Sequence, residues 1–228
     1  MSSVPITIAA GMLFGIALAA PPGPMNAIIA SESVLRGWSS GFLAGLGAMT
    51  ADLIFFLLAV VGVVTVIADR PRLRGVMLMI GGLLMLWFAV SAVRAVRQTA
   101  RAGGQTRGGV GSTGFQKAFV LALTNPYQII FWLTLGVGLL RPGQIDVLAV
   151  LPIVGSELAG WLVIQTGSPA LIVGFFGGIV VWITGFPALM VAAAERDATI
   201  STVVGVGSAA VLIGFGLLFL HTGVGLLG

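Results

Sequence analysis

The chain has 228 residues, of which 58% are hydrophobic and 8% are charged, with a net charge of +4, and its mean hydropathy is +1.13. Soluble domains carry about 25% charged residues, so the composition excludes an ordinary soluble protein and predicts a single membrane domain over residues 1–228. The absence of cysteine excludes disulfides and thiolate metal sites, and we interpret the positive charge as a signal for membrane orientation, with no nucleic-acid partner.

Six apolar stretches are long enough to cross a bilayer, since a spanning helix needs roughly 20 mostly apolar residues. The sequence predicts these helices near residues 6–31, 40–67, 75–93, 115–140, 168–194 and 202–222. The predicted fold is therefore an all-α, multi-pass protein of the plasma membrane with six transmembrane helices.

The first helix contains Pro22, Gly23 and Pro24 near its middle. Each proline lacks an N–H and clashes with the preceding turn, so the helix must break there. In hydrocarbon such a break is tolerated mainly where irregular backbone lines a cavity, and in secondary transporters it marks the substrate site. We expect these residues, with Met25 and Asn26, to bind substrate. The N–H groups after Pro24 would then face a carboxylate of the substrate. The alternative is a structural kink.

Asp52 is the only acid well inside a long span, about 12 residues into the second predicted helix. Ionised carboxylates at such depth are expensive and indicate function by default. We expect Asp52 to bind a substrate ammonium or to carry a proton; the alternative is an internal structural bond.

The stretch 94–114 is interpreted as a linker between two halves of three helices each, 1–93 and 115–228. With six spans, the eleven basic residues divide seven against four between the two sides, which predicts a cytoplasmic linker. Glu32, Arg94 and Arg97 are interpreted as membrane-interface residues, and the tryptophans as interface or packing residues.

The fourth predicted helix is interrupted at Asn125 and Pro126, about ten residues after its start. The residue before a proline disfavours the helical conformation, so a second break is expected here. The Asn125 amide either binds substrate or caps the freed carbonyl groups. We include Asn125, Pro126 and Tyr127 in the predicted substrate site, and Thr124 and Gln128 as polar wall.

Residues 147–164 are mostly apolar but contain Pro152, Gly155, Glu157 and Gly160. They form either a seventh span or a re-entrant or interfacial segment at about 145–166, inside an insertion at about 142–167. We favour the re-entrant segment, because these breakers are tolerated where backbone is buried in protein or lined by water. The role of Glu157 stays open.

The two halves resemble each other in sequence. The third helix contains Gly-Leu-Leu-Met-Leu from Gly82, and the sixth contains Gly-Leu-Leu-Phe-Leu from Gly216. The second and fifth helices share a pair of glycines four residues apart, and the first and fourth share the proline break. Three helices per half put the second half into the membrane from the opposite side, so an inverted repeat is predicted, with the substrate where the two breaks meet.

The Pro22-Gly23-Pro24 break, the Asp52 of the second helix and the Asn125-Pro126 pair, in this order, resemble the LysE/RhtB family of amino-acid exporters. The resemblance implies six helices and efflux of amino acids or related zwitterions by antiport with protons or sodium. Pro22, Gly23, Pro24, Asp52, Asn125 and Pro126 match its motifs. The chain departs from the family pattern at Ala51 and Tyr127, and its fifth helix lacks an acid.

The sequence is compatible with three classes of function. The first is a secondary exporter of amino acids, with the lipid bilayer and a small solute as partners and no cofactor. The second is a metal-ion exporter of the wider superfamily, against which stand no cysteine, one histidine and a single deep carboxylate. The third is a membrane scaffold or enzyme, for which the sequence offers no nucleophile–base pair. The sequence admits a homo-oligomer.

Overall fold

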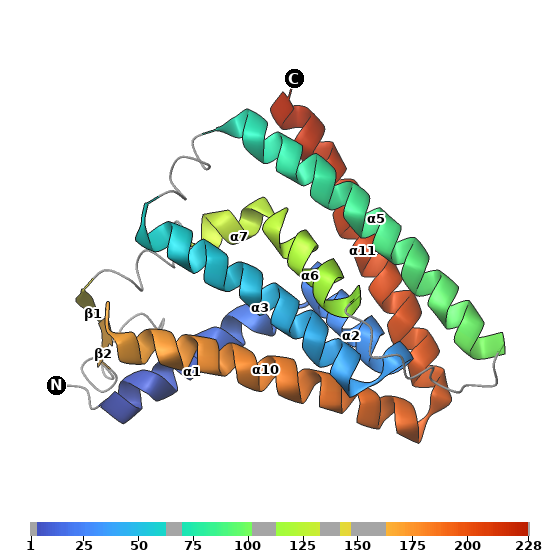
Figure 1. Ribbon diagram of the computed structural model, residues 1–228, viewed down its shortest axis with the longest axis horizontal. Coiled ribbons are helices and arrows are strands. Elements are labelled where there is room, and N and C mark those ends of the chain that lie inside the picture. Colours follow the sequence, from blue (N-terminus) through green and yellow to red (C-terminus); the bar gives the residue numbers. More distant parts are fainter. Residues whose placement is uncertain (1–3, 63–69, 102–112, 133–141, 147–162, 228) are drawn as a thin grey trace, which may run out of the picture.

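The computed structural model describes residues 4–62, 70–101, 113–132, 142–146 and 163–227, and helices dominate this part of the chain (Figure 1). In chain order they are α1 (Val4–Ala19), α2 (Pro24–Arg36), α3 (Trp38–Val60), α5 (Pro71–Arg101), α6 (Thr113–Leu123), α7 (Pro126–Phe131), α10 (Pro169–Arg196) and α11 (Ala198–Leu227). Strands β1 (Gly143–Asp146) and β2 (Val163–Thr166) lie between α7 and α10.

Four of these helices are long and apolar enough to cross a membrane, over Trp38–Val60, Pro71–Gln98, Pro169–Arg196 and Thr199–Leu227. α1 and α2 meet the same criterion together, as one span bent by 85°. The helical membrane architecture is therefore confirmed, with four or five spans among the described residues. The predicted fourth helix, 115–140, runs beyond residue 132, out of the described part of the chain.

α5 is longer than the hydropathy pattern predicted. The apolar stretch ends at residue 93, where the linker was expected to start, but the helix continues through Arg101. Residues 94–101 are mainly Ala, Val, Arg and Gln, which suit a helix even where they do not suit hydrocarbon. The glycines that end a helix appear only from Gly103 onward. The loss of hydropathy at Arg94 therefore marks the end of the apolar stretch and not the end of the helix.

Two short strands interrupt the helical pattern within the expected insertion. β1 and β2 pair antiparallel, with Gly143 opposite Thr166 and Asp146 opposite Val163. The sequence analysis did not predict this pairing. Residues 147–162, including Glu157, lie outside the described residues, so the choice between a seventh span and a re-entrant segment stays a prediction.

The turn between α10 and α11 is formed around Asp197. This exposed carboxylate accepts a hydrogen bond from the Thr199 N–H at 2.8 Å. That backbone bond, together with a bond from the Thr199 side chain, lowers the pKa of Asp197 below its ordinary value. Asp197 thus caps the first turn of α11.

Glycines allow the long helices to approach closely. α5 packs along α11, and α1 along α10. A Cβ atom on Gly82 would lie 2.8 Å from the Gly216 carbonyl oxygen, and one on Gly216 would lie 3.1 Å from that of Gly82. On α10, a Cβ on Gly178 would overlap the Met12 carbonyl of α1. Small residues at such contacts are typical of helices packed in a membrane.

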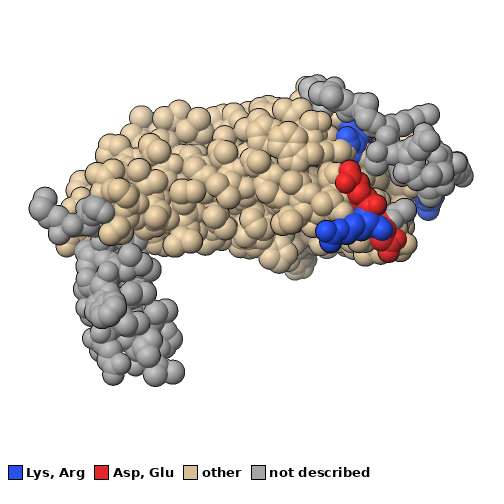
Figure 2. All heavy atoms as spheres, turned by 90° about the horizontal axis from the view of Figure 1, so that it is seen from below, with Lys and Arg blue, Asp and Glu red and all other residues tan. Residues whose placement is uncertain are grey.

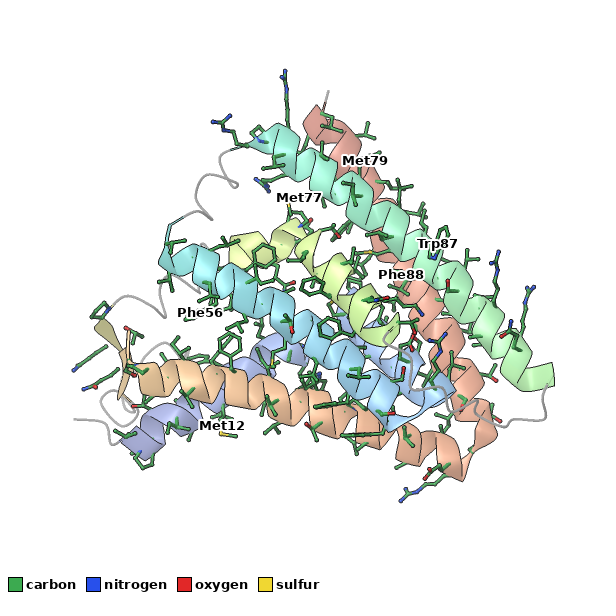
Figure 3. All side chains as sticks on the ribbon, viewed as in Figure 1. Met12, Phe56, Met77, Met79, Trp87 and Phe88 are labelled. Atoms are coloured by element: carbon green, nitrogen blue, oxygen red, sulfur yellow. The ribbon has the colours of Figure 1, made fainter. Side chains whose placement is uncertain are left out.

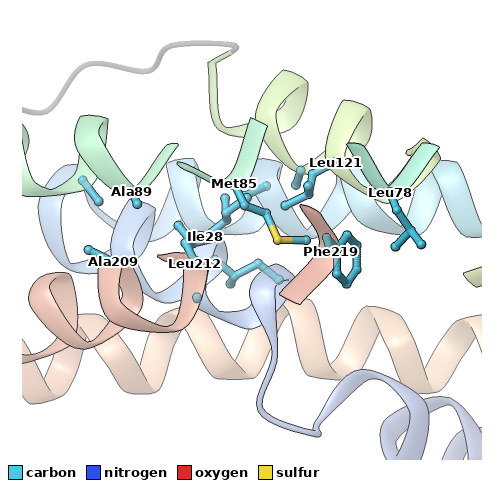
Figure 4. Close-up of a cluster of buried hydrophobic side chains, with 13 residues drawn as sticks. Ile28, Leu78, Met85, Ala89, Leu121, Ala209, Leu212 and Phe219 are labelled. Carbon is cyan, nitrogen blue, oxygen red and sulfur yellow. The ribbon is translucent and has the colours of Figure 1, made fainter. Parts of the chain in front are cut away.

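The main apolar core lies where α2, α5, α6 and α11 meet. Figure 4 shows Ile28 of α2, Met85 of α5, Leu121 of α6 and Phe219 of α11 in contact in this core. The outer faces of the helices are also apolar: Trp87 is 72% exposed and projects away from the other helices, beside the more buried Phe88 (Figure 3). Exposed apolar side chains of this kind suit contact with lipid.

Candidate substrate site

The predicted break in the first helix lies where the proline chemistry puts it. α1 ends at Ala19 and α2 begins at Pro24, at the 85° bend. Gly23 connects them in an extended conformation, with φ of −174° and ψ of −177°. The bend turns the N-terminus of α2 toward the interior of the molecule, since Pro24 and Asn26 are buried. The backbone is therefore irregular at the position that the sequence assigned to substrate.

Asn26 holds this break together. Its Nδ2 donates hydrogen bonds to the carbonyl oxygens of Ala19 at 2.6 Å and Pro21 at 2.9 Å. Its Oδ1 accepts a hydrogen bond from Trp182 Nε1 of α10 at 3.1 Å. The side chain thus replaces helical partners that α1 loses at its end. These bonds give the Asn26 side chain a capping role at the break.

The second break likewise ends one helix and starts the next at a proline, but its amide has a different partner. α6 ends at Leu123 and α7 begins at Pro126. Asn125 Oδ1 accepts a hydrogen bond from the Tyr127 N–H at 3.1 Å, which forms an Asx turn over the proline. Pro126 is buried, whereas Tyr127 is 48% exposed and contacts the ring of Phe219. The Asn-Pro pair therefore starts a new short helix rather than a simple kink.

Asp52 is joined to this second break by two hydrogen bonds. The residue is 6% exposed on the inner face of α3. Its Oδ1 accepts one bond from Gln128 Nε2 at 2.5 Å and one from Trp132 Nε1 at 3.3 Å. The sequence predicted Gln128 as polar wall and Trp132 as an interface or packing residue. One signal was available: Gln128 follows Pro126 by two residues, as Asn26 follows Pro24.

A cavity of about 370 Å³ lies between the two breaks. Eight of the nine predicted site residues line it, and the ninth, Pro126, does not. The eight are Pro22, Gly23, Pro24, Met25, Asn26, Asp52, Asn125 and Tyr127. The structure thus brings together residues that are about 100 positions apart in the chain.

The cavity is lined by a few polar side chains and by many apolar ones. Asp52 is the single charged residue among the described residues that line it. Beside the residues of the first break, the apolar lining includes Leu18, Ile29, Ala48, Met49, Phe131, Ile179, Ile183, Phe215 and Phe219. Within the described residues, no three His, Cys, Asp or Glu side chains gather in a way that would hold a metal ion. A small solute with one cationic group and an apolar body matches this lining.

Comparison with known proteins identifies the family. The model of the LysE type translocator family matches residues 16–163. A leucine efflux protein of Salmonella typhimurium (strain LT2) is 32% identical over 114 residues, which cover 50% of this chain and 53% of that protein. A leucine efflux protein of Enterobacter sp. (strain 638) is 30% identical over 116 residues, which cover 50% of this chain and 54% of that protein. The putative amino acid efflux protein YcgF of Bacillus subtilis (strain 168) is 27% identical over 126 residues, 54% of this chain and 58% of that protein.

The matched region spans about half the length of these curated relatives. No solved structure matches the chain. The family match covers both helix breaks, Asp52 and the cavity residues of the first half, and it confirms the resemblance drawn from these motifs. The chain therefore belongs to the LysE type translocator family, and its long apolar helices make it a multi-pass protein of the plasma membrane.

Proposed function

We propose that this protein is a secondary active exporter of amino acids or related small zwitterions. The observation that carries the proposal is the cavity that holds one buried carboxylate, Asp52, between two broken helices. Its volume of about 370 Å³ falls within the roughly 300–1,000 Å³ of small-molecule sites. The relatives named as leucine or amino acid efflux proteins support the same solute class.

The substrate is oriented by its two charged groups. Its ammonium faces Asp52, whose Oδ1 is already held by Gln128 and Trp132, so the carboxylate is fixed before substrate arrives. Its carboxylate faces the N-terminus of α2 at Met25 and Asn26, where the helix dipole is positive. No basic residue is found among the described lining residues, which leaves this backbone as the anion receptor. The side chain of the substrate contacts the apolar lining.

The transport cycle uses an inverted repeat. Two observations support this part of the proposal. Gly82 and Gly216, matched by internal sequence similarity, contact each other across α5 and α11, as residues near a two-fold axis do. In addition, the amide two residues after each proline bonds to a long helix of the other half: Asn26 to α10 and Gln128 to α3. Related halves that exchange conformations underlie alternating access in many transporters.

Export is coupled to protons or sodium through Asp52. A single carboxylate cannot neutralise the substrate ammonium and hold a proton or sodium ion at the same time. The two occupants therefore exclude each other, which is the requirement for exchange. This makes Asp52 both a substrate residue and the coupling residue.

Flux in proteoliposomes tests the proposal. Purified protein is reconstituted, loaded with labelled leucine or leucine methyl ester, and energised with a pH or sodium gradient. We expect gradient-driven efflux of leucine and weaker efflux of the ester, because the ester lacks the carboxylate. Equal efflux of both solutes would show that the carboxylate is not recognised. Flux of divalent cations without amino-acid flux would replace the proposal with the metal-exporter alternative.

A further inference from the structure

A second group of polar side chains surrounds the carboxylate of Glu32 on α2, outside the cavity. Glu32 is 5% exposed. Its Oε1 accepts a hydrogen bond from Lys117 Nζ of α6 at 2.6 Å, and its Oε2 accepts one from Ser40 Oγ of α3 at 2.7 Å. Arg36 Nη1 lies 3.3 Å from Oε2 and donates a hydrogen bond to Thr113 Oγ1 at 2.6 Å. These five residues, the Glu32 cluster, join α2 to α3 and α6.

The Glu32 cluster lies between the cavity and one end of the molecule. Along α2 the cavity wall stops at Ile29, and along α3 it starts at Gly45, whereas Glu32 and Ser40 lie beyond these limits. α2 ends and α3 and α6 begin at this end of the molecule. On the face shown in Figure 2, charged side chains gather at the same end, near the turn between α10 and α11. The distribution of basic residues predicts this end to be cytoplasmic.

α2 is a short helix with a glycine at each end. Its 13 residues run between Gly23, which is extended, and Gly37, whose φ of +95° favours glycine. A Cβ atom on either glycine would meet nothing within 4 Å, so there is open space beside both connections. Asn26 ties the first turn of α2 to Ala19, Pro21 and Trp182. The helix is thus held at its cavity end by Asn26 and at its far end by the Glu32 cluster.

We propose that the Glu32 cluster closes the transport pathway at this end, and that opening of the Glu32–Lys117 pair lets α2 turn about Gly23 and exposes the cavity to that side. This inference rests on the proposed function as a transporter. Glu32 then acts as a positioning residue for the α2 wall of the cavity, Met25 and Ile29, and it does not touch the substrate. α6, which carries Lys117, contributes no described residue to the cavity wall.

The chemistry of the pair fits a contact that must break and reform. Taking two charges out of water is costly, and a buried ion pair is often no more stabilising than apolar packing of the same volume. A permanent seal between α2 and α6 would therefore be built equally well from leucines, as it is at Ile28 and Leu121 in the same interface. A charged pair has a second stable state, with both partners hydrated, which an apolar seal lacks. This difference favours a switchable contact over a static one.

Cysteine accessibility tests the inference without background, because the chain contains no cysteine. Ala48→Cys places a thiol in the cavity wall on α3. Arg196→Cys, exposed at the end of α10, reports which side of the membrane the Glu32 cluster faces. The labelling rate of the Ala48→Cys thiol by an impermeant maleimide is then measured from each side, in intact cells and in inside-out vesicles.

Glu32→Gln and Lys117→Gln are each expected to raise this rate about tenfold from the Arg196 side only, equivalent to about 1.4 kcal/mol in the closed-to-open equilibrium. Lys117→Arg keeps the charge and should leave the rate near that of the parent. Glu195→Gln, an exposed acid at the same end, is the matched control and should change nothing. Unchanged rates in both Gln variants, or equal increases from both sides, would overturn the inference.

A cross-link covers the case in which the neutral variants do not fold. Glu32→Cys with Lys117→Cys is joined by a bis-methanethiosulfonate, which forms a disulfide with each thiol as methanesulfinate leaves, and this link should abolish flux until it is reduced. Flux that continues through the cross-linked protein would overturn the inference. The labelling assay needs no solute, so the two proposals fail separately. A one-sided labelling increase without amino-acid flux contradicts the proposed substrate and supports the closure, whereas normal flux without that increase contradicts the closure alone.

Discussion

Asp52→Asn isolates the charge of the cavity from its shape. Both hydrogen bonds to Asp52, from Gln128 and from Trp132, end on the same oxygen, Oδ1. Asparagine keeps an acceptor at this atom, so both donors retain their partner and the fold is expected to survive. The variant loses the only charge among the described lining residues. A hydrogen bond to a charged group contributes about 1.5–3 kcal/mol, so binding of a substrate ammonium should weaken about 10- to 150-fold.

Binding and flux measurements separate the two roles of Asp52. Binding is measured by ligand-dependent thermal stabilisation in detergent, with Glu195→Gln as the control for loss of an acid outside the cavity. Gradient-driven efflux is measured in proteoliposomes and should be lost in Asp52→Asn, while exchange of substrate at high concentration on both sides persists. A dissociation constant within twofold of the parent, together with normal efflux, would refute the assignment of Asp52.

Three further outcomes follow from the packing. Asn26→Leu leaves two carbonyl groups and the Trp182 N–H without partners. Each unsatisfied group destabilises the folded protein by about 1–3 kcal/mol, so the variant should have a lower Tm and a lower substrate affinity. An unchanged Tm would contradict the capping role. Gly178→Ala should lower the Tm, because the added Cβ meets the backbone of α1 and overpacking of this kind costs about 1–3 kcal/mol. Gly185→Ala on the same helix is the control and should leave the Tm unchanged, because its Cβ meets nothing within 4 Å. Because the pKa of Asp197 is lowered in the folded state, its cap stabilises α11 at neutral pH and loses this effect as pH falls through the lowered pKa. Asp197→Ala should therefore reduce the acid-side drop in Tm, and an identical pH profile would contradict this.

The helix breaks were predictable because their cause is local. Pro22, Pro24 and Pro126 lack an N–H whatever surrounds them, and a residue before proline avoids the helix in any fold. The burial of Asp52 inside the protein was predictable for a similar reason, since a charged side chain deep in a span is costly in hydrocarbon and almost always faces the protein interior. The end of α5 was not predicted, because hydropathy reports where hydrocarbon ends and not where hydrogen bonding along a helix ends.

The partners of these residues were beyond sequence reasoning, because they depend on long-range packing. Gln128 and Trp132 lie 76 and 80 positions from Asp52, and nothing in their own segment indicates a carboxylate nearby. Glu32 was interpreted as a membrane-interface residue, but the structure buries it at 5% exposure. Its partner Lys117 lies 85 positions away, and only the approach of α6 to α2 and α3 removes it from the surface.

In the proposed inverted repeat, the two amides that follow the prolines have different tasks. Asn26 and Gln128 occupy matched positions and reach matched long helices, but Asn26 meets the indole of Trp182 and Gln128 meets the carboxylate of Asp52. On the Asn26 side the amide is fully used by backbone and indole, so this side supplies rigidity to the pivot of α2. On the Gln128 side both bonds converge on one carboxylate oxygen, and Oδ2 is the atom left to meet a solute. In the proposed repeat, the single acid among the described lining residues therefore makes one break a chemical pole and leaves the other a mechanical pole. The proposed substrate lies between them, with its ammonium toward the first and its carboxylate toward the second.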